Sequence, residues 1–409
     1  MTQAVGISTA TRRSGEGRVV GLVGAAHFAS HYFILLLPPL FPFLRQEYDV
    51  SYTDLGLALA AFNIVSAVFQ TPAGFFTDRI GAHTILVLGL LCSGLSLGLA
   101  AIVPWFWLVV VMFGLAGLGN TVYHPADYAI LSHHISSRRI GSAYSIHTFA
   151  GMLGAAVAPG SLLLIERWLG WRYAFGSASL LGGAVAAVLI LQRKFLVVSP
   201  ERAAHVTRSG RAHHSQWRLL LSPPLLRNLL LFVILALISG GLQNYSVVAL
   251  VAVHVTTLPV ADAALTGYLL LTALGVLLGG LVAARTSRHD TVAAIGLVVV
   301  AAAVSPIALV DLNPTILIAL MAIAGLFSGL IMPSRDMIVR AQTPPGAFGT
   351  VFGFVTTGFN IGGIVAPLLF GSLMDHGYAR AIFSLSAAFC LLSIVVLAGG
   401  RWSEREAAQ

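Results

Sequence analysis

The chain has 409 residues, of which 57% are hydrophobic and 9% are charged. Because soluble domains carry about 25% charged residues, this composition excludes an ordinary water-facing domain. The formal net charge of +8 could suit a nucleic-acid partner, but the basic residues lie in short loops between apolar segments, where they act as topology determinants. We therefore expect a protein embedded in the lipid bilayer, with no nucleic-acid partner.

Apolar segments follow one another along the whole chain. A helix needs about 20 apolar residues to cross a bilayer, and cutting the chain at its charged or Pro/Gly-rich breaks gives twelve such segments. The predicted fold class is an all-α membrane protein with twelve transmembrane helices in two pseudo-symmetric six-helix bundles. The expected spans are 19–44, 53–76, 84–103, 107–131, 140–165 and 173–192 in the first half, and 227–253, 263–284, 291–310, 315–339, 348–374 and 380–400 in the second.

The same cuts define the domain organisation. We expect an N-terminal tail (1–18), a six-helix bundle (19–192), a polar linker (193–226), a second six-helix bundle (227–400) and a C-terminal tail (401–409). The first apolar segment is too long for the core of a signal peptide, so we interpret it as an uncleaved span. Both cysteines fall inside apolar segments and are expected to be free thiols.

The distribution of Lys and Arg predicts the orientation. With the N-terminus in the cytoplasm, eighteen basic residues lie in cytoplasmic segments and four lie on the opposite side. Cytoplasmic loops carry an excess of Lys and Arg, so we expect both termini and the linker to be cytoplasmic. The expected location is a bacterial-type inner membrane, and the expected working unit is a monomer.

The two halves repeat each other with an offset of 208 residues and no gap. Asp54 corresponds to Asp262, and the pair Ala158-Pro159 corresponds to Ala366-Pro367. Such a duplication of membrane spans is typical of secondary transporters, whose binding site lies between the repeats. Further equivalent positions are Gly117 and Gly325, Pro125 and Pro333, Gly141 and Gly349, and Gly154 and Gly362; the four repeated prolines are expected to bend spans 4, 5, 10 and 11.

The loop between spans 2 and 3 carries a motif. Segment 74–83 reads Gly-Phe-Phe-Thr-Asp-Arg-Ile-Gly-Ala-His, which resembles the cytoplasmic-loop signature of the major facilitator superfamily, with Ala and His in place of the usual basic pair. We expect Gly74 to permit close helix contact, Asp78 to cap a helix start and pair with a basic partner across the interface of its half, and Gly81 to form the turn; Arg79 belongs to the same motif. The resemblance covers nearly the whole chain and implies the twelve-helix transporter fold.

Spans 4 and 5 carry narrower resemblances. The sequence Tyr123-His124-Pro125-Ala126 is similar to the fosmidomycin-resistance group of that superfamily. This resemblance implies a proton-driven exporter of a small anionic phosphonate drug. Residues 151–160 partly resemble the glycine-proline motif of antiporters, but they lack the double glycine that follows in that motif, so antiport is only suggested.

Few ionisable side chains lie inside the expected spans. Placing Arg or Asp at membrane depth costs about 2.5–3.5 kcal/mol on insertion scales, so each such residue needs a partner or water. The ionisable residues inside the spans are His27 and His31 in span 1, His124 and Asp127 in span 4, His147 in span 5, and Arg335 and Asp336 in span 10. Among them we treat Asp127, Arg335, His124, His27 and His31 as candidates for proton coupling or gating.

Asp127 and Arg335 occupy equivalent positions in the two repeats. We hypothesise that they form an ion pair between the halves when the cytoplasmic side is closed, and that protonation of Asp127 or an anionic substrate at Arg335 releases it. In the alternative, Arg335 pairs within its own half or extends to the interface. Asp336 is an awkward partner, because adjacent residues on a helix point about 100° apart.

The histidines suit proton transfer, because imidazole titrates near neutral pH. His27 and His31 share a helix face, and His124 lies one turn before Asp127. A zinc site is conceivable, but the spacing matches no known ligand motif, so we expect no metal. The side chains expected to form the substrate cavity are Tyr32, Tyr123, His147, Gln243, Asn244 and Asn360, with helix packing as the alternative role for His147 and the amides.

These features predict a secondary active transporter of a small organic molecule, with proton-coupled efflux of a drug or metabolite by alternating access. The alternative is a proton-coupled importer of a small organic anion, a carboxylate or organophosphate, with Arg335 as the anion contact. The chain shows no P-loop, cofactor fingerprint or nucleophile–base pair at a recognisable spacing, so we expect neither an enzyme nor a bound cofactor.

Overall fold

The computed structural model describes residues 2–136, 139–197, 219–344 and 348–406. In these residues twelve helical segments are long and apolar enough to cross a membrane, which confirms the expected all-α fold. Most of the predicted linker lies outside the described residues. The helices of the first half are α1 (Thr2–Ile34), α2 (Phe41–Tyr48), α3 (Tyr52–Ile80), α4 (Ala82–Ala100), α5 (Phe106–Asn120), α6 (Tyr123–His134), α7 (Ile140–Leu169) and α8 (Trp171–Leu191), with short 3₁₀ turns at Pro38–Leu40 and Arg193–Phe195.

The second half begins after the linker and repeats this plan. Its first span is interrupted by a π-helical turn at Gly240–Tyr245, where the hydrogen bonds skip one residue more than in an α-helix. The helices are α11 (Pro223–Ser239), α12 (Ser246–His254), α13 (Leu258–Ala283), α14 (His289–Leu309), α15 (Pro314–Ala341), α16 (Phe348–Asp375) and α17 (Ala379–Glu406).

The two halves pack in the same way, as the repeat predicts. In the first half α1 contacts α7, α3 contacts α5, and α4 contacts α8; in the second α11 contacts α16, α13 contacts α15, and α14 contacts α17. The repeated glycines explain part of this equivalence. Gly117 lies against the backbone of Phe62, and its counterpart Gly325 lies against the backbone of Tyr268, so a Cβ at either position would collide with the neighbouring helix.

Besides the π-helical turn, the spans differ from the predicted ones at two breaks. Span 1 ends its regular helix at Ile34, because Pro38 and Pro39 cannot donate the backbone hydrogen bonds that would extend it. Span 4 breaks at Thr121 and Val122, not at Pro125 itself. The ring of a proline clashes with the carbonyl four residues earlier, which places the disturbance upstream. Helices α7, α15 and α16 continue through their prolines.

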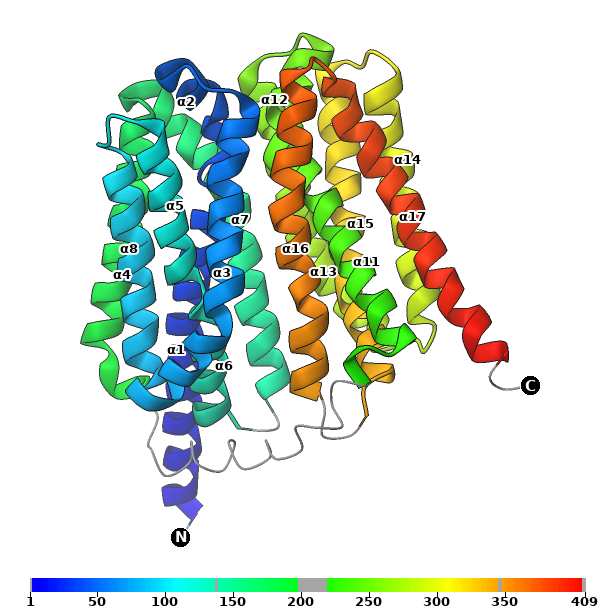
Figure 1. Ribbon diagram of the computed structural model, residues 1–409. Coiled ribbons are helices and arrows are strands. Elements are labelled where there is room, and N and C mark those ends of the chain that lie inside the picture. The colour runs from blue at the N-terminus through cyan, green and yellow to red at the C-terminus, as the bar shows by residue number, and fades with distance from the viewer. Residues whose placement is uncertain (1, 137–138, 198–218, 345–347, 407–409) are drawn as a thin grey trace.

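Helix α1 begins and α17 ends at the same end of the bundle, which we call the terminal end (Figure 1). The opposite end, where α2 and α12 lie, we call the closed end. Helix α1 starts at Thr2, so the stretch expected as a polar tail is helical. The shared end agrees with an even number of spans, and the side of the membrane on which it lies stays a prediction.

At the closed end the two halves contact each other through α3 and α16 and through α7 and α13. The carboxylate of Asp375, the last residue of α16, accepts hydrogen bonds from Tyr52 N (2.7 Å), Thr53 N (2.8 Å) and Thr53 Oγ1 (2.6 Å) at the start of α3. The Tyr245 hydroxyl of the second half lies 3.4 Å from the Tyr52 carbonyl of the first, and donates to the Pro367 carbonyl of its own half at 2.7 Å. A carboxylate at a helix N-terminus interacts favourably with the free amides and the helix dipole, so this contact holds the halves together.

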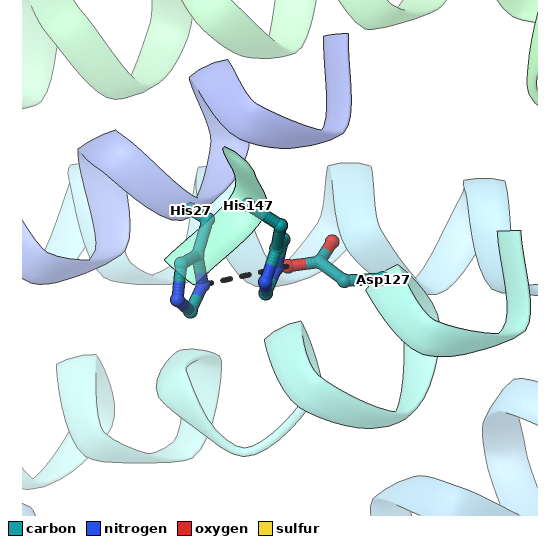
Figure 2. Close-up of side chains that lie close together, drawn as sticks. All are labelled: His27, Asp127 and His147. Carbon is teal, nitrogen blue, oxygen red and sulfur yellow. Dashed lines mark hydrogen bonds and ion pairs between the residues drawn. The ribbon is translucent and has the colours of Figure 1, made fainter. Parts of the chain in front are cut away.

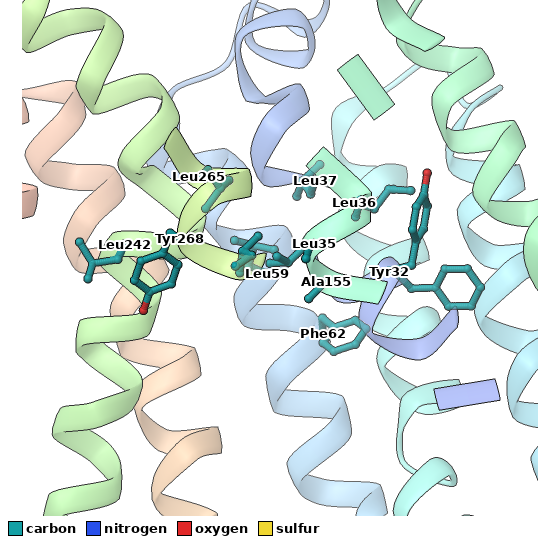
Figure 3. Packing of buried hydrophobic residues seen from close by; sticks show 14 of the residues in the cluster. Tyr32, Leu35, Leu36, Leu37, Leu59, Phe62, Ala155, Leu242, Leu265 and Tyr268 are labelled. Carbon is teal, nitrogen blue, oxygen red and sulfur yellow. The ribbon is translucent and has the colours of Figure 1, made fainter. Parts of the chain in front are cut away.

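An apolar seal lies beside these polar contacts. One buried cluster contains Leu37 and Leu59 from the first half together with Leu242 and Leu265 from the second (Figure 3). Each of these leucines has 6% or less of its surface exposed. Burying a leucine contributes about 1.5–3 kcal/mol, although inside a membrane part of this gain is matched by lipid contact.

The close helix contacts lead to a first prediction. Replacing Gly325 by Ala should destabilise the protein by about 1–3 kcal/mol, because the added methyl collides with the Tyr268 backbone and forces α13 and α15 apart. The matched control is Gly280→Ala on α13, where nothing lies within 4 Å of an added Cβ. The melting temperature of each purified variant in detergent gives the answer. Equal melting temperatures for the two variants would contradict the packing argument.

Candidate functional site

Three helices of the first half bring a carboxyl group and two imidazoles together inside the protein. Asp127 of α6 has no exposed surface. Its Oδ2 lies 2.8 Å from His147 Nε2 on α7 and 3.5 Å from His27 Nδ1 on α1 (Figure 2). With its proton on Nε2, His147 donates a hydrogen bond to the carboxylate. A buried carboxylate is expensive unless such donors or a cation surround it, so these histidines decide its charge state.

Two further histidines complete what we call the His–Asp cluster, composed of His27, His31, His124, Asp127 and His147. The ring of His27 stacks on His147 with centroids 3.8 Å apart, and lies 4.6 Å from His31 and 5.4 Å from His124. Two imidazolium charges about 5 Å apart repel by about 3 kcal/mol at an effective dielectric of 20. The cluster therefore favours a small number of shared protons over several charged rings.

Several polar atoms of this cluster have spare hydrogen-bonding capacity. Asp127 Oδ1, His27 Nδ1 and His147 Nδ1 are buried and have no hydrogen-bond partner in the described part of the chain. Buried polar groups normally have partners, and those without one often mark a functional role or bound water. Here the unsatisfied atoms belong to groups that can bind or release a proton.

The cluster reaches an exposed surface through α6. His124 is exposed. Tyr128, one turn further along α6, is 41% exposed, and its ring lies 5.9 Å from His124 and 5.6 Å from His147. The carboxylate of Asp336 on α15 lies close enough for its charge to act on the Tyr128 hydroxyl. The buried carboxyl group is thus connected to a surface that faces the second half.

Gly151 of α7 makes room for the imidazoles. A Cβ at this position would lie 2.5 Å from His27 Cδ2 and 2.9 Å from His31 Cδ2. Any larger residue would displace both rings from the cluster. The sequence resemblance drew attention to this glycine as part of an antiporter motif, whereas the structure gives it the role of a spacer beside the histidines.

The same atoms have a spacing that could suit a metal ion. His27, Asp127 and His147 each offer one ligand atom, and these atoms lie within 4.8 Å of one another. His and Asp are ligands for zinc and other transition metals. However, the 2.8 Å contact between His147 and Asp127 has the length of a direct hydrogen bond. We keep the expectation of no metal as a prediction.

Arg335 does not contact Asp127 in this conformation. Its Nε and Nη2 donate to Asp336 Oδ1 at 2.9 and 2.8 Å, and its guanidinium stacks on the rings of Phe232 and Phe359 at 4.6 and 5.1 Å. The expectation that Asp336 is an awkward partner is therefore wrong, because the long arginine side chain turns back to its neighbour. The ion pair with Asp127 was expected for the state in which the cytoplasmic side is closed, and it stays a prediction for that state.

The expected cavity residues are scattered. Tyr32 and Tyr123 are 6% and 2% exposed and lie in the hydrophobic core, so they form no exposed wall here. The Tyr32 hydroxyl lies 2.9 Å from Ser161 Oγ, which explains its burial. Three amides in the second half, Gln243 and Asn244 in the π-helical turn and Asn360 on α16, are half-buried.

The loop motif has a different structural role from the one expected. Gly81 has φ of 100°, a conformation that favours glycine, which confirms the turn. An added Cβ at Gly74 would have no neighbour within 4 Å, so the expected close helix contact is wrong. Asp78 and Arg79 lie in the last turn of α3, and α4 begins without a side-chain cap, so the expectation that Asp78 caps a helix start is also wrong.

Sequence reasoning missed several residues. Tyr128 was not singled out, and Asp336 of the other half, which the sequence named without giving it a role, lies close enough for its charge to act on the Tyr128 hydroxyl. The two are related by the same 208-residue offset as Asp127 and Arg335, so the repeat could have identified them as a pair. Asp375 gave no local signal, because its partners are more than 300 residues away. Asp262 is 8% exposed, faces Gly160 of α7 and has an Oδ1 without a partner, although the sequence marked it only as a repeat position.

Comparisons with known proteins agree with this architecture. The family model described as Major Facilitator Superfamily matches residues 23–260 and 241–408. The chain is 22% identical to the Fosmidomycin resistance protein of Escherichia coli (strain K12), over 95% of this chain and 94% of that protein. It is 25% identical to the "Uncharacterized MFS-type transporter YfnC" of Bacillus subtilis (strain 168), over 87% and 86%. Among solved structures, that of the nucleoside transporter NupG has a TM-score of 0.77 at 11% identity, covering 93% of this chain and 99% of that one.

Proposed function

Because this chain belongs to the major facilitator superfamily, and is thus a membrane transporter and not an enzyme, we propose that it exports a small organic molecule in exchange for protons. The observation that carries the proposal is the His–Asp cluster. A proton-coupled transporter needs a group whose protonation differs between its two conformations. A buried carboxyl group held by two histidines, with unsatisfied atoms on all three residues, suits that role.

The conformation supports an alternating-access cycle. Helix α3 of the first half lies against α16 of the second from Thr53 and Asp375, at the closed end, to Asn63 and Gly363 further along the two helices. The distribution of arginines favours a cytoplasmic terminal end and a bacterial-type inner membrane. In this proposal the conformation is closed to the outside, and the proton on the cluster is released toward the cytoplasm through His124 and Tyr128.

Export and import predict opposite effects of deleting the protein from cells. The full-length similarity to a fosmidomycin resistance protein supports efflux. Import of an organic anion is favoured by one observation, the position of Arg335 in a pocket of the second half. Deleting an exporter sensitises cells to its substrate, whereas deleting an importer starves them of the substrate or makes them resistant to its toxic analogues.

The proposal is tested with purified protein in liposomes. A pH gradient is imposed, and the movement of a panel of phosphonates, carboxylates and neutral drug-like compounds is followed. We expect at least one compound to accumulate against its concentration gradient, and collapse of the pH gradient with a protonophore to stop this. Transport that is unaffected by the protonophore would overturn proton coupling.

Substitution of His147 tests the cluster within this proposal. In His147→Gln the side-chain amide still donates to Asp127 but cannot take up a proton. We expect the dependence of transport on pH between about 5 and 8 to flatten while the protein stays folded. His376→Gln, at an exposed histidine of the closed end, is the matched control. An unchanged pH profile in His147→Gln would show that His147 is only a packing residue.

A further inference from the structure

A buried carboxyl group lies at the contact between the two halves, apart from the His–Asp cluster. Asp262, near the start of α13, is 8% exposed, and its Oδ1 is buried without a hydrogen-bond partner among the described residues. Helix α13 of the second half packs against α7 of the first. A Cβ added at Gly160 of α7 would lie 3.8 Å from Asp262 Oδ2, so the carboxyl group faces the other half.

A hydroxyl group faces the same point of α7. Thr266 lies one turn after Asp262 on the same face of α13, and its Oγ1 is also buried without a partner in the described part of the chain. The same Cβ at Gly160 would lie 3.8 Å from Thr266 Oγ1. Leu265 of the apolar seal stands between Asp262 and Thr266 in the sequence. The carboxyl group and the hydroxyl therefore border the seal that separates the halves at the closed end.

The equivalent aspartate of the first half has an ordinary structural role. Asp54 Oδ2 accepts hydrogen bonds from Ser51 N at 3.0 Å and Ser51 Oγ at 2.7 Å, which completes a capping box at the start of α3. In such a box the acidic residue stands three positions after the N-cap. The N-cap of α13 is Thr257, so Asp262 stands too far along its helix for this role. Helix capping therefore does not explain why a carboxyl group is buried here.

The charge of an ionised Asp262 would be unbalanced in this conformation. Burial acts on the carboxyl group, and no charged side chain in the described part of the chain does. The elements packed against α13 are α7, α12, α15 and the π-helical turn. Glu166 and Arg167, at the closed end of α7, lie about 9 Å or more beyond Gly160 along that helix.

The other ionisable groups of these four elements have partners elsewhere or lie at the terminal end. They are His254 on the Ile307 carbonyl, Tyr245 on the Pro367 carbonyl, Tyr144 on Ser132, His147 on Asp127, Arg335 on Asp336, and Arg340 in the last turn of α15. A buried carboxylate without a cation or a donor is expensive, whereas the protonated acid is neutral and can donate a hydrogen bond. The closed conformation therefore favours the protonated form of Asp262.

We infer that Asp262 is a second proton-binding site, separate from the His–Asp cluster, and that a proton on it favours closure of the closed end. The inference rests on the alternating-access cycle of the proposed function. When α7 and α13 separate, Asp262 meets water about one turn from the start of α13 and ionises. When the halves close again, it takes up a proton from the solution on that side. Closure thereby depends on the pH of the solution at the closed end.

Infrared difference spectroscopy of the purified protein detects this proton directly. A protonated carboxylic acid has a carbonyl stretching band that an ionised carboxylate lacks. At about pH 5 exposed aspartates are mostly ionised, so a band that persists there belongs to a shielded acid. We expect one such band to be missing from Asp262→Asn and to remain in Asp127→Asn and in Asp311→Asn, whose carboxyl group is exposed at the same end.

Spin labels test the link between this proton and closure. They are placed on Gln46→Cys and Tyr378→Cys, exposed positions of the two halves, after Cys92→Ser and Cys390→Ser. A proton bound in the closed conformation stabilises that conformation at low pH, and the stabilisation is lost as the pH rises. Asp262→Asn has a side chain of the same size that is neutral at every pH.

At about pH 8 we expect the ratio of closed to open molecules to be at least about tenfold higher in Asp262→Asn than with Asp262 in place. This excess should shrink as the pH is lowered toward about 4, and Asp311→Asn should show none of it. Equal ratios in Asp262→Asn and the unmodified protein at all pH values, or no carbonyl band lost in Asp262→Asn, would overturn the inference. Neither measurement uses substrate or a proton gradient, so failure of this site and failure of proton-coupled transport are distinguishable.

Discussion

Replacing Asp127 by Asn should abolish accumulation driven by a pH gradient while leaving downhill equilibration of substrate. The amide has the size of the carboxyl group and still offers an oxygen to His147 Nε2, so the packing of α1, α6 and α7 is retained. It cannot bind a proton, and the histidines lose the negative charge that stabilises their protonated form. The measurement is steady-state accumulation in liposomes, which should fall to the level reached without a gradient.

The control for this variant is Asp49→Asn. Asp49 is exposed at the end of α2 with φ of 50°, a left-handed conformation that asparagine also adopts readily. The substitution Asp49→Asn removes one negative charge at the closed end and leaves the His–Asp cluster unchanged. Accumulation should therefore match that of the unmodified protein. Full gradient-driven accumulation in Asp127→Asn would show that the coupling proton is carried elsewhere.

Asp375→Asn should open the closed end. The carboxylate of Asp375 accepts three hydrogen bonds from the start of α3 and joins the two halves. Loss of a charged cap at a helix N-terminus costs about 1–2 kcal/mol, which shifts the ratio of closed to open molecules by roughly 5- to 30-fold. Spin labels on exposed positions of the two halves, Gln46→Cys and Tyr378→Cys in the protein without native cysteines, report this shift as a longer distance distribution.

Asp311→Asn is the matched control for that experiment. Asp311 lies at the same end and pairs with Arg380 at 2.8 Å, but it is 84% exposed and belongs to the same half as its partner. Exposed pairs contribute about 0–1 kcal/mol, and this one does not bridge the halves. Its distance distribution should therefore match that of the unmodified protein. If Asp375→Asn also leaves the distribution unchanged, the apolar seal alone holds the closed end.

The sequence predicts the number of spans, the internal repeat and the similar packing of the two halves. The length of an apolar segment and the position of a glycine can be read directly from it. Gly117 and Gly325 were visible as a repeated pair, and both turned out to mark close helix contacts. The breaks were harder to predict. The π-helical turn at Gly240–Tyr245 depends on packing against α16 and α17, which hydrophobic pattern alone does not encode.

The candidate site was predictable as a set of residues but not as a set of contacts. Ionisable groups at membrane depth are rare, so composition pointed to Asp127 and the histidines. Which histidine contacts the carboxylate depends on how α7 is rotated against α6. His147, which was expected in the cavity wall or in helix packing, has the shorter of the two contacts with it. Arg335 similarly found the adjacent Asp336, because side-chain length outweighed the angle between neighbouring Cβ positions.

The central claim is that protons carried by the His–Asp cluster and substrate move in one coupled cycle. The most direct test uses liposomes with no initial pH gradient, loaded with a compound identified in the transport panel and a pH-sensitive dye. An outward substrate gradient alone should acidify the lumen of liposomes with the unmodified protein, as substrate leaves in exchange for protons, and Asp127→Asn should move substrate without a pH change. Substrate efflux with no pH change in the unmodified protein, or the same acidification in Asp127→Asn, would contradict the account.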